Sequence, residues 1–120
     1  MKIMLIDDDR DFLFYFKEYH AHVDVQYESN PVSWLDDITF QQADLNKFDL
    51  IFCDFYFSNL NQNAFQLKIS KYIREHGFKN KLVLLSALSD FEEDFVKNES
   101  FDLILKKLDL DSIDNILTYN

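Results

Sequence analysis

The chain contains only one cysteine, one glycine and one proline among its 120 residues. A lone cysteine, Cys53, cannot form an intramolecular disulfide, which excludes a disulfide-rich secreted domain and favours a reduced cytosolic protein. Apolar runs are short, and none approaches the roughly 20 residues needed to span a bilayer. The first run ends at Asp7-Asp8-Asp9, before it is long enough for a secretory signal. We therefore expect a soluble, cytoplasmic protein without an export signal or membrane contact.

Positive charge is scarce as well. The sequence has 12 basic and 22 acidic residues, for a formal net charge of −10, so its average field repels nucleic acids and anionic membranes. We therefore expect no nucleic-acid binding by this chain. Apolar residues make up 48% of the sequence, enough for the core of one domain. No linker, repeat or low-complexity tract interrupts it, so residues 1–120 are predicted to form a single domain.

Five short apolar or β-branched runs recur along the chain, each followed by a segment with helical signals. They cover residues 2–6, 23–27, 49–54, 81–86 and 103–105. The first, third and fourth are nearly continuously apolar, as expected for parallel strands covered on both faces. The pattern predicts an α/β fold, a doubly wound five-stranded parallel sheet of the flavodoxin-like (βα)5 type with strand order 2-1-3-4-5.

Five helices are predicted from capping residues and apolar spacing. The first is capped by Asp8 or Asp9, and the second begins at Asn30-Pro31. The third covers residues 63–76 and ends at Gly77, the fourth begins at a capping box over residues 89–92, and the fifth covers residues 111–117. The first helix is expected to pack through an aromatic stripe formed by Phe12, Tyr15, Phe16 and Tyr19.

Polar side chains end or follow four of the five predicted strands. Asp7 and Asp8 follow the first, Asp54 ends the third, Ser86 ends the fourth, and Lys106 follows the fifth. Ligands of doubly wound sheets bind at this carboxyl edge. Carboxylates that converge there repel one another unless a divalent cation neutralises them, and hard oxygen ligands select Mg²⁺ or Mn²⁺. Because Mg²⁺ keeps exchangeable positions for a phosphoryl oxygen, the pattern indicates phosphate chemistry.

Four sequence blocks lie at these strand ends: Ile3-Met4-Leu5-Ile6-Asp7-Asp8-Asp9, Leu50-Ile51-Phe52-Cys53-Asp54, Leu82-Val83-Leu84-Leu85-Ser86-Ala87 and Leu103-Ile104-Leu105-Lys106. They resemble the signature blocks of response-regulator receiver domains from bacterial two-component systems. The resemblance covers the whole chain. The order of the blocks, with each block at a strand end, is more specific than any single block.

The resemblance implies a Mg²⁺ site and a phosphoacceptor. By it, Asp8 binds Mg²⁺ directly, Asp7 acts through metal-bound water, and Asp54 is both metal ligand and phosphoacceptor. The backbone carbonyl of Tyr56 is expected to complete the protein ligands, and its side chain to slow loss of the phosphoryl group. Ser86 is expected to contact that group.

The resemblance also assigns the phosphoryl contact to Lys106 rather than to its neighbour Lys107. Adjacent residues at a strand end point to opposite sides, so only one of the two lysines is expected to reach the acceptor.

The partners implied by this resemblance are a sensor histidine kinase or phosphotransfer protein and a downstream protein target. The chain would then be a signalling switch rather than an enzyme, apart from its own phosphorylation and dephosphorylation. A phosphorylation-dependent dimer is also compatible with the resemblance.

The sequence departs from the family pattern at several positions. Phe57-Ser58 stands where the family has Met-Pro, and the loop at residues 59–63 is about two residues longer than usual. Lys107 occupies the position of a proline, and Leu103 that of an aromatic switch residue. These departures leave a second hypothesis open, a degenerate receiver that binds partners without phosphorylation.

A third reading is a phosphatase of the haloacid-dehalogenase type, because Asp7-Asp8-Asp9 fits an Asp-x-Asp motif after a strand. Against it, Asp11 stands where that family has threonine, no later Gly-Asp-x-x-x-Asp block exists, and Asp54 would have no role.

Overall fold

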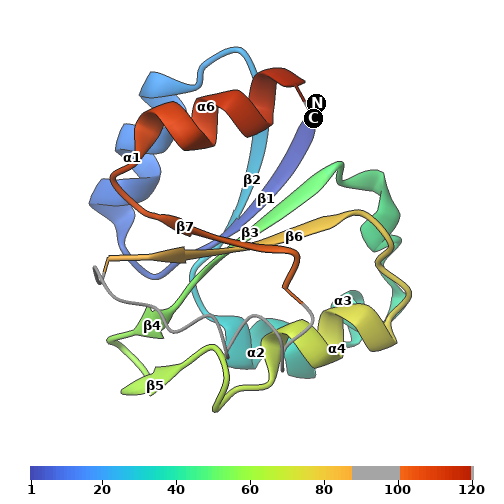
Figure 1. Ribbon diagram of the computed structural model, residues 1–120. Helices are drawn as coiled ribbons and strands as arrows, with labels where there is room; N and C mark the ends of the chain where they lie inside the picture. Colours follow the sequence, from blue (N-terminus) through green and yellow to red (C-terminus); the bar gives the residue numbers. More distant parts are fainter. Residues whose placement is uncertain (88–100, 120) are drawn as a thin grey trace.

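The computed structural model describes residues 1–87 and 101–119, except the side chains of residues 38, 39 and 119. At its centre lies a five-stranded parallel sheet in the order β2-β1-β3-β6-β7 (Figure 1). Without the short hairpin strands β4 and β5, this is the order 2-1-3-4-5, so the predicted fold class is confirmed. The sheet strands are β1 (Lys2–Ile6), β2 (Asp24–Glu28), β3 (Leu50–Asp54), β6 (Lys81–Ser86) and β7 (Leu103–Lys106).

The apolar runs predicted these strands to within one residue at each end. β3 is buried along its whole length, and β6 is buried from its second residue onward. Both strands are therefore covered on two faces, which is why their sequences are apolar without alternation. β2 lies at one edge of the sheet and is only partly buried.

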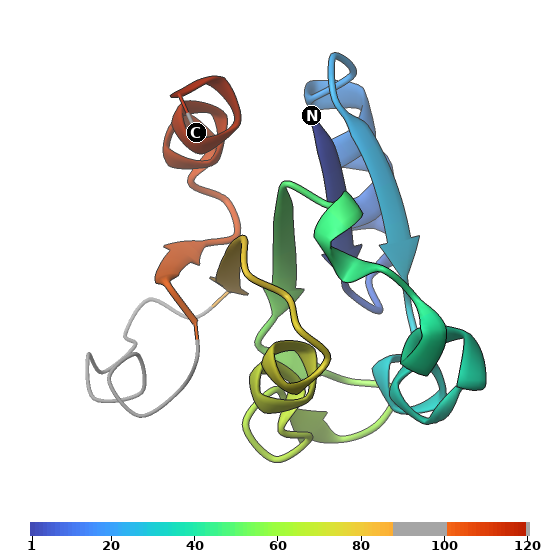
Figure 2. The ribbon, with the colours of Figure 1, turned by 90° about the vertical axis from the view of Figure 1, so that its right-hand side faces the viewer.

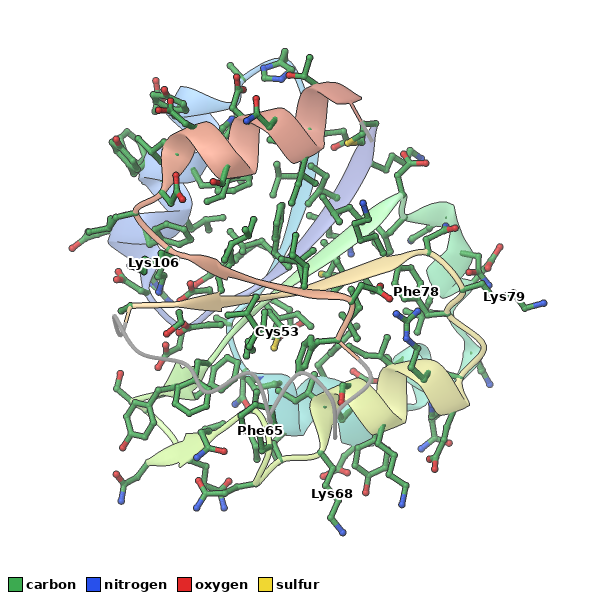
Figure 3. The ribbon with its side chains drawn as sticks, viewed as in Figure 1. Cys53, Phe65, Lys68, Phe78, Lys79 and Lys106 are labelled. Atoms are coloured by element: carbon green, nitrogen blue, oxygen red, sulfur yellow. The ribbon has the colours of Figure 1, made fainter. Side chains whose placement is uncertain are left out.

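Helices cover both faces of the sheet. α1 (Arg10–Tyr19) and α6 (Leu110–Tyr119) lie on one face, and α2 (Pro31–Asp36), α3 (Ile38–Gln42) and α4 (Ile69–Glu75) lie on the other (Figures 1 and 2). Successive strand residues point to opposite faces, so the buried strands contribute side chains to two apolar clusters, one on each face of the sheet. In β3, for example, Phe52 packs in the cluster with α1 and α6. Its neighbour Cys53 packs with α2 and α4 (Figure 3).

The start of α1 follows the predicted capping chemistry. Oδ1 of Asp9 accepts hydrogen bonds from the backbone N–H groups of Asp11 at 3.0 Å and Phe12 at 3.2 Å. Only half of the predicted aromatic stripe faces the core. Phe12 and Phe16 are buried, but Tyr15 and Tyr19 are exposed and stack on each other. The prediction was wrong for the two tyrosines, because their row lies beside the buried row, at the solvent edge of the helix.

The segment after β2 begins as predicted and then breaks. The side chain of Asn30 caps α2 by accepting from the N–H of Ser33, and Pro31 occupies the first turn. The chain turns extended at Asp37 before α3 begins. A short 3-10 helix, η1 (Leu45–Lys47), then leads into β3.

The helix predicted over residues 63–76 is much shorter than expected. α4 covers only Ile69–Glu75 and is preceded by Lys68 in a left-handed conformation, with φ of 55°. Lys68 points away from the molecule (Figure 3). The predicted end is correct, because Gly77 has a φ of 88°, a value that favours glycine.

A short antiparallel hairpin occupies the segment between β3 and α4. Its strands are β4 (Tyr56–Phe57) and β5 (Gln62–Asn63). Phe57 is fully buried and anchors this hairpin in the core beside α4. The sequence analysis did not predict it.

The last predicted helix is present and longer than expected. α6 covers Leu110–Tyr119 and packs through Ile113 and Leu117. The helix predicted to begin at residues 89–92 lies outside the described residues. Within residues 1–87 and 101–119, no helix is long and apolar enough to cross a membrane.

Candidate functional site

Polar groups meet at the carboxyl edge of the sheet, as predicted. Asp7 follows β1, Asp54 is the last residue of β3, and Lys107 follows β7. They lie beside a cavity of about 350 Å³ whose lining residues come from the ends of β1, β3, β6 and β7 and from the hairpin. These are Asp8, Asp9, Asp54, Phe55, Tyr56, Ser58, Ala87 and Lys107.

Three carboxylates form the acidic part of the site. One oxygen from each of Asp7, Asp8 and Asp54 lies within 4.8 Å of the other two. Asp7 is fully buried and Asp54 is 5% exposed, whereas Asp8 is partly exposed. A compact set of carboxylate oxygens at the mouth of a cavity fits Mg²⁺, which prefers hard oxygen ligands and retains several waters. The residues present therefore fit a magnesium ion.

Lys107 is the cation of this cluster. Its Nζ lies 2.8 Å from Oδ2 of Asp7 and 3.5 Å from Oδ2 of Asp54. The same ammonium lies 4.5 Å from the ring centroid of Phe12, on α1. The residue is only 8% exposed. Its ammonium, which is strongly hydrated in water, is therefore largely desolvated here, and the two carboxylates and the aromatic face replace its hydration shell.

The sequence analysis expected Lys106 beside the acceptor, but the structure has its neighbour Lys107 there; the phosphoryl contact itself stays a prediction. In the ladder between β6 and β7, Lys106 lies opposite Ser86 and is exposed. The backbone N–H of Lys107 then donates to the carbonyl of Ser86 at 2.7 Å. Adjacent residues point to opposite sides of the sheet. With this register Lys107 points toward Asp54 and the Phe12 ring of α1, and Lys106 points to the other side, where it is exposed.

The pKa values of the cluster reflect burial of like charges. Burial, with a further contribution from the Asp7 carboxylate, raises the pKa of Asp54 to about 7 against the opposing effect of Lys107. Burial also raises the pKa of Asp7. Burial lowers the pKa of Lys107, but Asp54 and Asp7 together outweigh that effect and raise it above its ordinary value. The charge of one lysine therefore does not fully offset the burial and mutual repulsion of the carboxylates. A further positive charge at the site would stabilise their ionised forms.

Asp8 is held by the hairpin rather than by the lysine. Its Oδ2 accepts hydrogen bonds from the Ser58 hydroxyl and from the backbone N–H of Asn59, each at 3.0 Å. These contacts span about fifty residues of sequence. The sequence offered no signal for them, since they depend on a hairpin that the periodicity did not predict.

The remaining predicted site residues lie at the ends of their strands. Ser86 is the last residue of β6 and is buried, and the next residue, Ala87, lines the cavity. Tyr56 lines the cavity from β4, with 44% of its surface exposed, and its hydroxyl donates to Oδ1 of Asn61 across the hairpin. The metal contact predicted for the Tyr56 carbonyl and the phosphoryl contact predicted for Ser86 stay predictions.

Comparisons with known proteins found similarity among solved structures, but not among family models or curated sequences. No protein-family model matches the chain, and no curated protein sequence matches it significantly. Among the structures, the response regulator TrrA from Thermotoga maritima, solved in complex with Mg²⁺–BeF, has a TM-score of 0.73 at 19% identity, over 98% of this chain and 96% of that one.

Two receiver structures give similar values. A CheY-like receiver domain from Methylobacillus flagellatus has a TM-score of 0.72 at 19% identity, over 98% of this chain and 96% of that one. A response regulator receiver protein from Sinorhizobium medicae has a TM-score of 0.70 at 18% identity, over 98% of this chain and 91% of that one. The similarity spans both chains almost completely, in agreement with the sheet order and the acidic edge. The chain therefore has the fold of a response-regulator receiver domain.

Proposed function

We propose that this chain is a phosphorylation-controlled signalling domain that accepts a phosphoryl group on Asp54. The observation that carries the proposal is the position of the Asp54 carboxylate. It lies at the end of β3, at the mouth of a cavity, with two further carboxylates and the Lys107 ammonium beside it. The expected donor is the phosphohistidine of a sensor histidine kinase or phosphotransfer protein, or a small phosphodonor.

In the proposed reaction an oxygen of Asp54 forms a bond to phosphorus while the bond from phosphorus to the donor nitrogen or oxygen breaks. Its other oxygen, Oδ1, accepts the backbone N–H of Phe55 at 2.9 Å, which fixes the orientation of the carboxylate. The Lys107 ammonium, 3.5 Å from Oδ2 of Asp54, would neutralise negative charge on the transferred group.

Asp8, Asp54 and the Tyr56 carbonyl would hold Mg²⁺, with Asp7 acting through water. The ion supplies positive charge that offsets repulsion between the incoming phosphoryl oxygens and the carboxylates.

The proposed output is contact with another protein. Ser86 ends β6, directly opposite Lys106 of β7, so a hydrogen bond from its hydroxyl to the phosphoryl group would change the surface around that edge strand. The target is expected to be a protein, or a second copy of the chain, rather than a nucleic acid.

A degenerate receiver that works without phosphorylation remains the second candidate. It is favoured by Leu103, which is 37% exposed on β7 at the position of the aromatic switch residue. A haloacid-dehalogenase-type phosphatase is disfavoured, because that reading gives no role to Asp54, which the fold places in contact with Lys107.

The test is the intact mass of the protein after incubation with acetyl phosphate and Mg²⁺. The proposal expects one added phosphoryl group that is blocked by a chelator and removed by hydroxylamine, as for an acyl phosphate. A chain that never gains mass under these conditions, at any donor concentration, would favour the degenerate receiver. Continuous release of phosphate from phosphate esters would instead favour the phosphatase.

Tyr56 is expected to slow the loss of the phosphoryl group. Its ring lines the cavity and is held across the hairpin by Asn61, so it restricts the approach of an attacking water. Tyr56→Ala is expected to shorten the lifetime of the phosphorylated protein several-fold, as measured by phosphate release at fixed Mg²⁺. Tyr56→Phe keeps the ring and serves as the matched control. A slower or unchanged decay in Tyr56→Ala would refute the shielding role.

A further inference from the structure

Asp8 differs from the other two carboxylates in how it is held. Lys107 pairs with Asp7 and Asp54. Asp8, by contrast, accepts two hydrogen bonds from neutral groups, and both go to the same oxygen, Oδ2. A carboxylate oxygen has two lone pairs, so Ser58 and Asn59 saturate Oδ2 and leave Oδ1 as the oxygen that can bind a cation.

The two donors are carried by a segment that is fixed at both ends. Phe57, directly before Ser58, is fully buried. The backbone N–H of Ala64, after the hairpin, donates to the carbonyl of Phe55 at 2.7 Å. The N–H of Phe55 is shared between Oδ1 of Asp54 and the carbonyl of Leu85 on β6, the latter at 2.8 Å. The hairpin is therefore attached to the sheet beside the acceptor, and its donors are held in place before any ligand arrives.

We infer that Ser58, together with the backbone N–H of Asn59, positions Asp8 for a divalent cation and couples the hairpin to cation binding. The inference rests on the proposed function, because it requires that Asp8 bind the ion. It adds a residue at a position where the sequence departs from the family pattern. Hydrogen bonds to a ligating carboxylate fix its orientation, and removing such a partner typically weakens metal affinity by about 10- to 100-fold.

The opposite effect of Ser58 on cation affinity also has a clear physical cause. If Ser58 and Asn59 competed with the ion for Asp8, removal of the hydroxyl would tighten binding. The geometry favours positioning over competition, because both donors use Oδ2. Linkage then requires the reciprocal effect: a bound ion stabilises the contact, and the Asn59 amide becomes better protected from hydrogen exchange.

The experiment is a Mg²⁺ titration of the chelator-treated chain, followed by calorimetry or amide chemical shifts. Ser58→Ala is expected to bind Mg²⁺ about tenfold more weakly than wild type, whereas Ser58→Thr, which keeps the hydroxyl, restores most of the affinity. Ser33→Ala on α2 is the matched serine control and should bind as wild type does. In wild type, Mg²⁺ should slow hydrogen exchange at the Asn59 amide, and this response should be smaller in Ser58→Ala.

The Asp8→Asn variant tests the metal site itself, separately from the positioning role of Ser58. If wild type binds Mg²⁺ and Asp8→Asn binds much more weakly, the metal site stands. Unchanged or tighter binding by Ser58→Ala would then overturn the positioning role alone. If wild type does not bind Mg²⁺, or Asp8→Asn binds it equally well, the proposed metal site itself fails.

Discussion

A chain with Asp54 replaced by Asn is expected to gain no phosphoryl group and, without metal, to be more stable than wild type at pH 8. The first effect follows from loss of the nucleophilic oxygen. The second follows from burial, which together with the Asp7 carboxylate raises the pKa of Asp54 to about 7 from an ordinary value of 3.8. Asn is neutral and nearly the same size, so it removes the buried charge without leaving a hole.

The sign of the pH dependence can be worked out from these two values. Between pH 3.8 and about 7 the folded state keeps a proton on Asp54 that the unfolded state has released. Folding stability therefore falls as pH rises through this window and stays low above it. The difference in pKa corresponds to a change in folding free energy on the order of 4 kcal/mol. Loss of the contact with Lys107 makes the net gain in Asp54→Asn smaller than this value.

Urea unfolding at pH 5 and pH 8 in the presence of a chelator measures this effect. The stability advantage of Asp54→Asn over wild type should be larger at pH 8 than at pH 5. Asp36→Asn, an exposed position on α2, is the matched control and should show no such trend. An Asp54→Asn chain that still gains mass from acetyl phosphate would place the acceptor elsewhere. One that is less stable than wild type at pH 8 would contradict the buried-charge argument.

The strands were predictable because parallel strands buried on both faces require continuous apolar runs. The run Leu50–Asp54 is buried throughout, as such a run requires. Caps were predictable where a single residue makes the contact, as at Asn30 and Gly77. Both signals are local, so the sequence contains them in full.

The segment between β3 and α4 was not predictable in the same way. Phe65, Ile69, Tyr72 and Ile73 keep helical spacing, which indicated one long helix. In the structure Phe65 lies before the helix and contacts the ring of Phe55, at the start of the hairpin segment, and the ring of Phe101, which is far from it in sequence. The left-handed turn at Lys68 has no glycine or asparagine to announce it. Tertiary packing therefore overrode the local periodicity.

The acidic part of the site was predictable, but its cation was not. Asp7, Asp8 and Asp54 had to converge, because parallel neighbouring strands end at the same edge of the sheet. Lys106 and Lys107 are chemically identical neighbours, so the choice between them depends on where β7 ends relative to β6. That register is set by the pairing of β7 with β6, in which Lys106 lies opposite Ser86. The sequence of residues 103–105 alone does not reveal this pairing.

The two lysines are therefore expected to differ strongly when each is replaced by alanine. Lys107→Ala removes a buried ammonium from contact with Asp7 and Asp54. Phosphoryl uptake should fall by about 100-fold, the usual scale for loss of a group that stabilises charge in the transition state. Lys106→Ala removes an exposed side chain from the other side of β7, and its rate should stay close to that of wild type.

The Lys107→Ala chain is also expected to be less stable, because Asp7 stays fully buried without its cation. Removing one partner of a buried ion pair costs about 3–5 kcal/mol. Circular dichroism and urea unfolding show whether the variant is folded under the labelling conditions. Lys107→Arg keeps the positive charge and provides a second variant in which stability is preserved but the ammonium geometry is changed.

Labelling rates from acetyl phosphate at fixed Mg²⁺, measured by intact mass, decide between the two lysines. A folded Lys107→Arg or Lys107→Ala chain should be slower than Lys106→Ala, because only Lys107 lies within 3.5 Å of the acceptor. If Lys106→Ala were the slower chain, β7 would have to end one residue earlier in the reacting state, at Leu105, than it does in this fold. Equal rates in all variants would mean that Asp54 reacts without help from either lysine, and that the buried ammonium serves only to hold Asp7 in the folded chain.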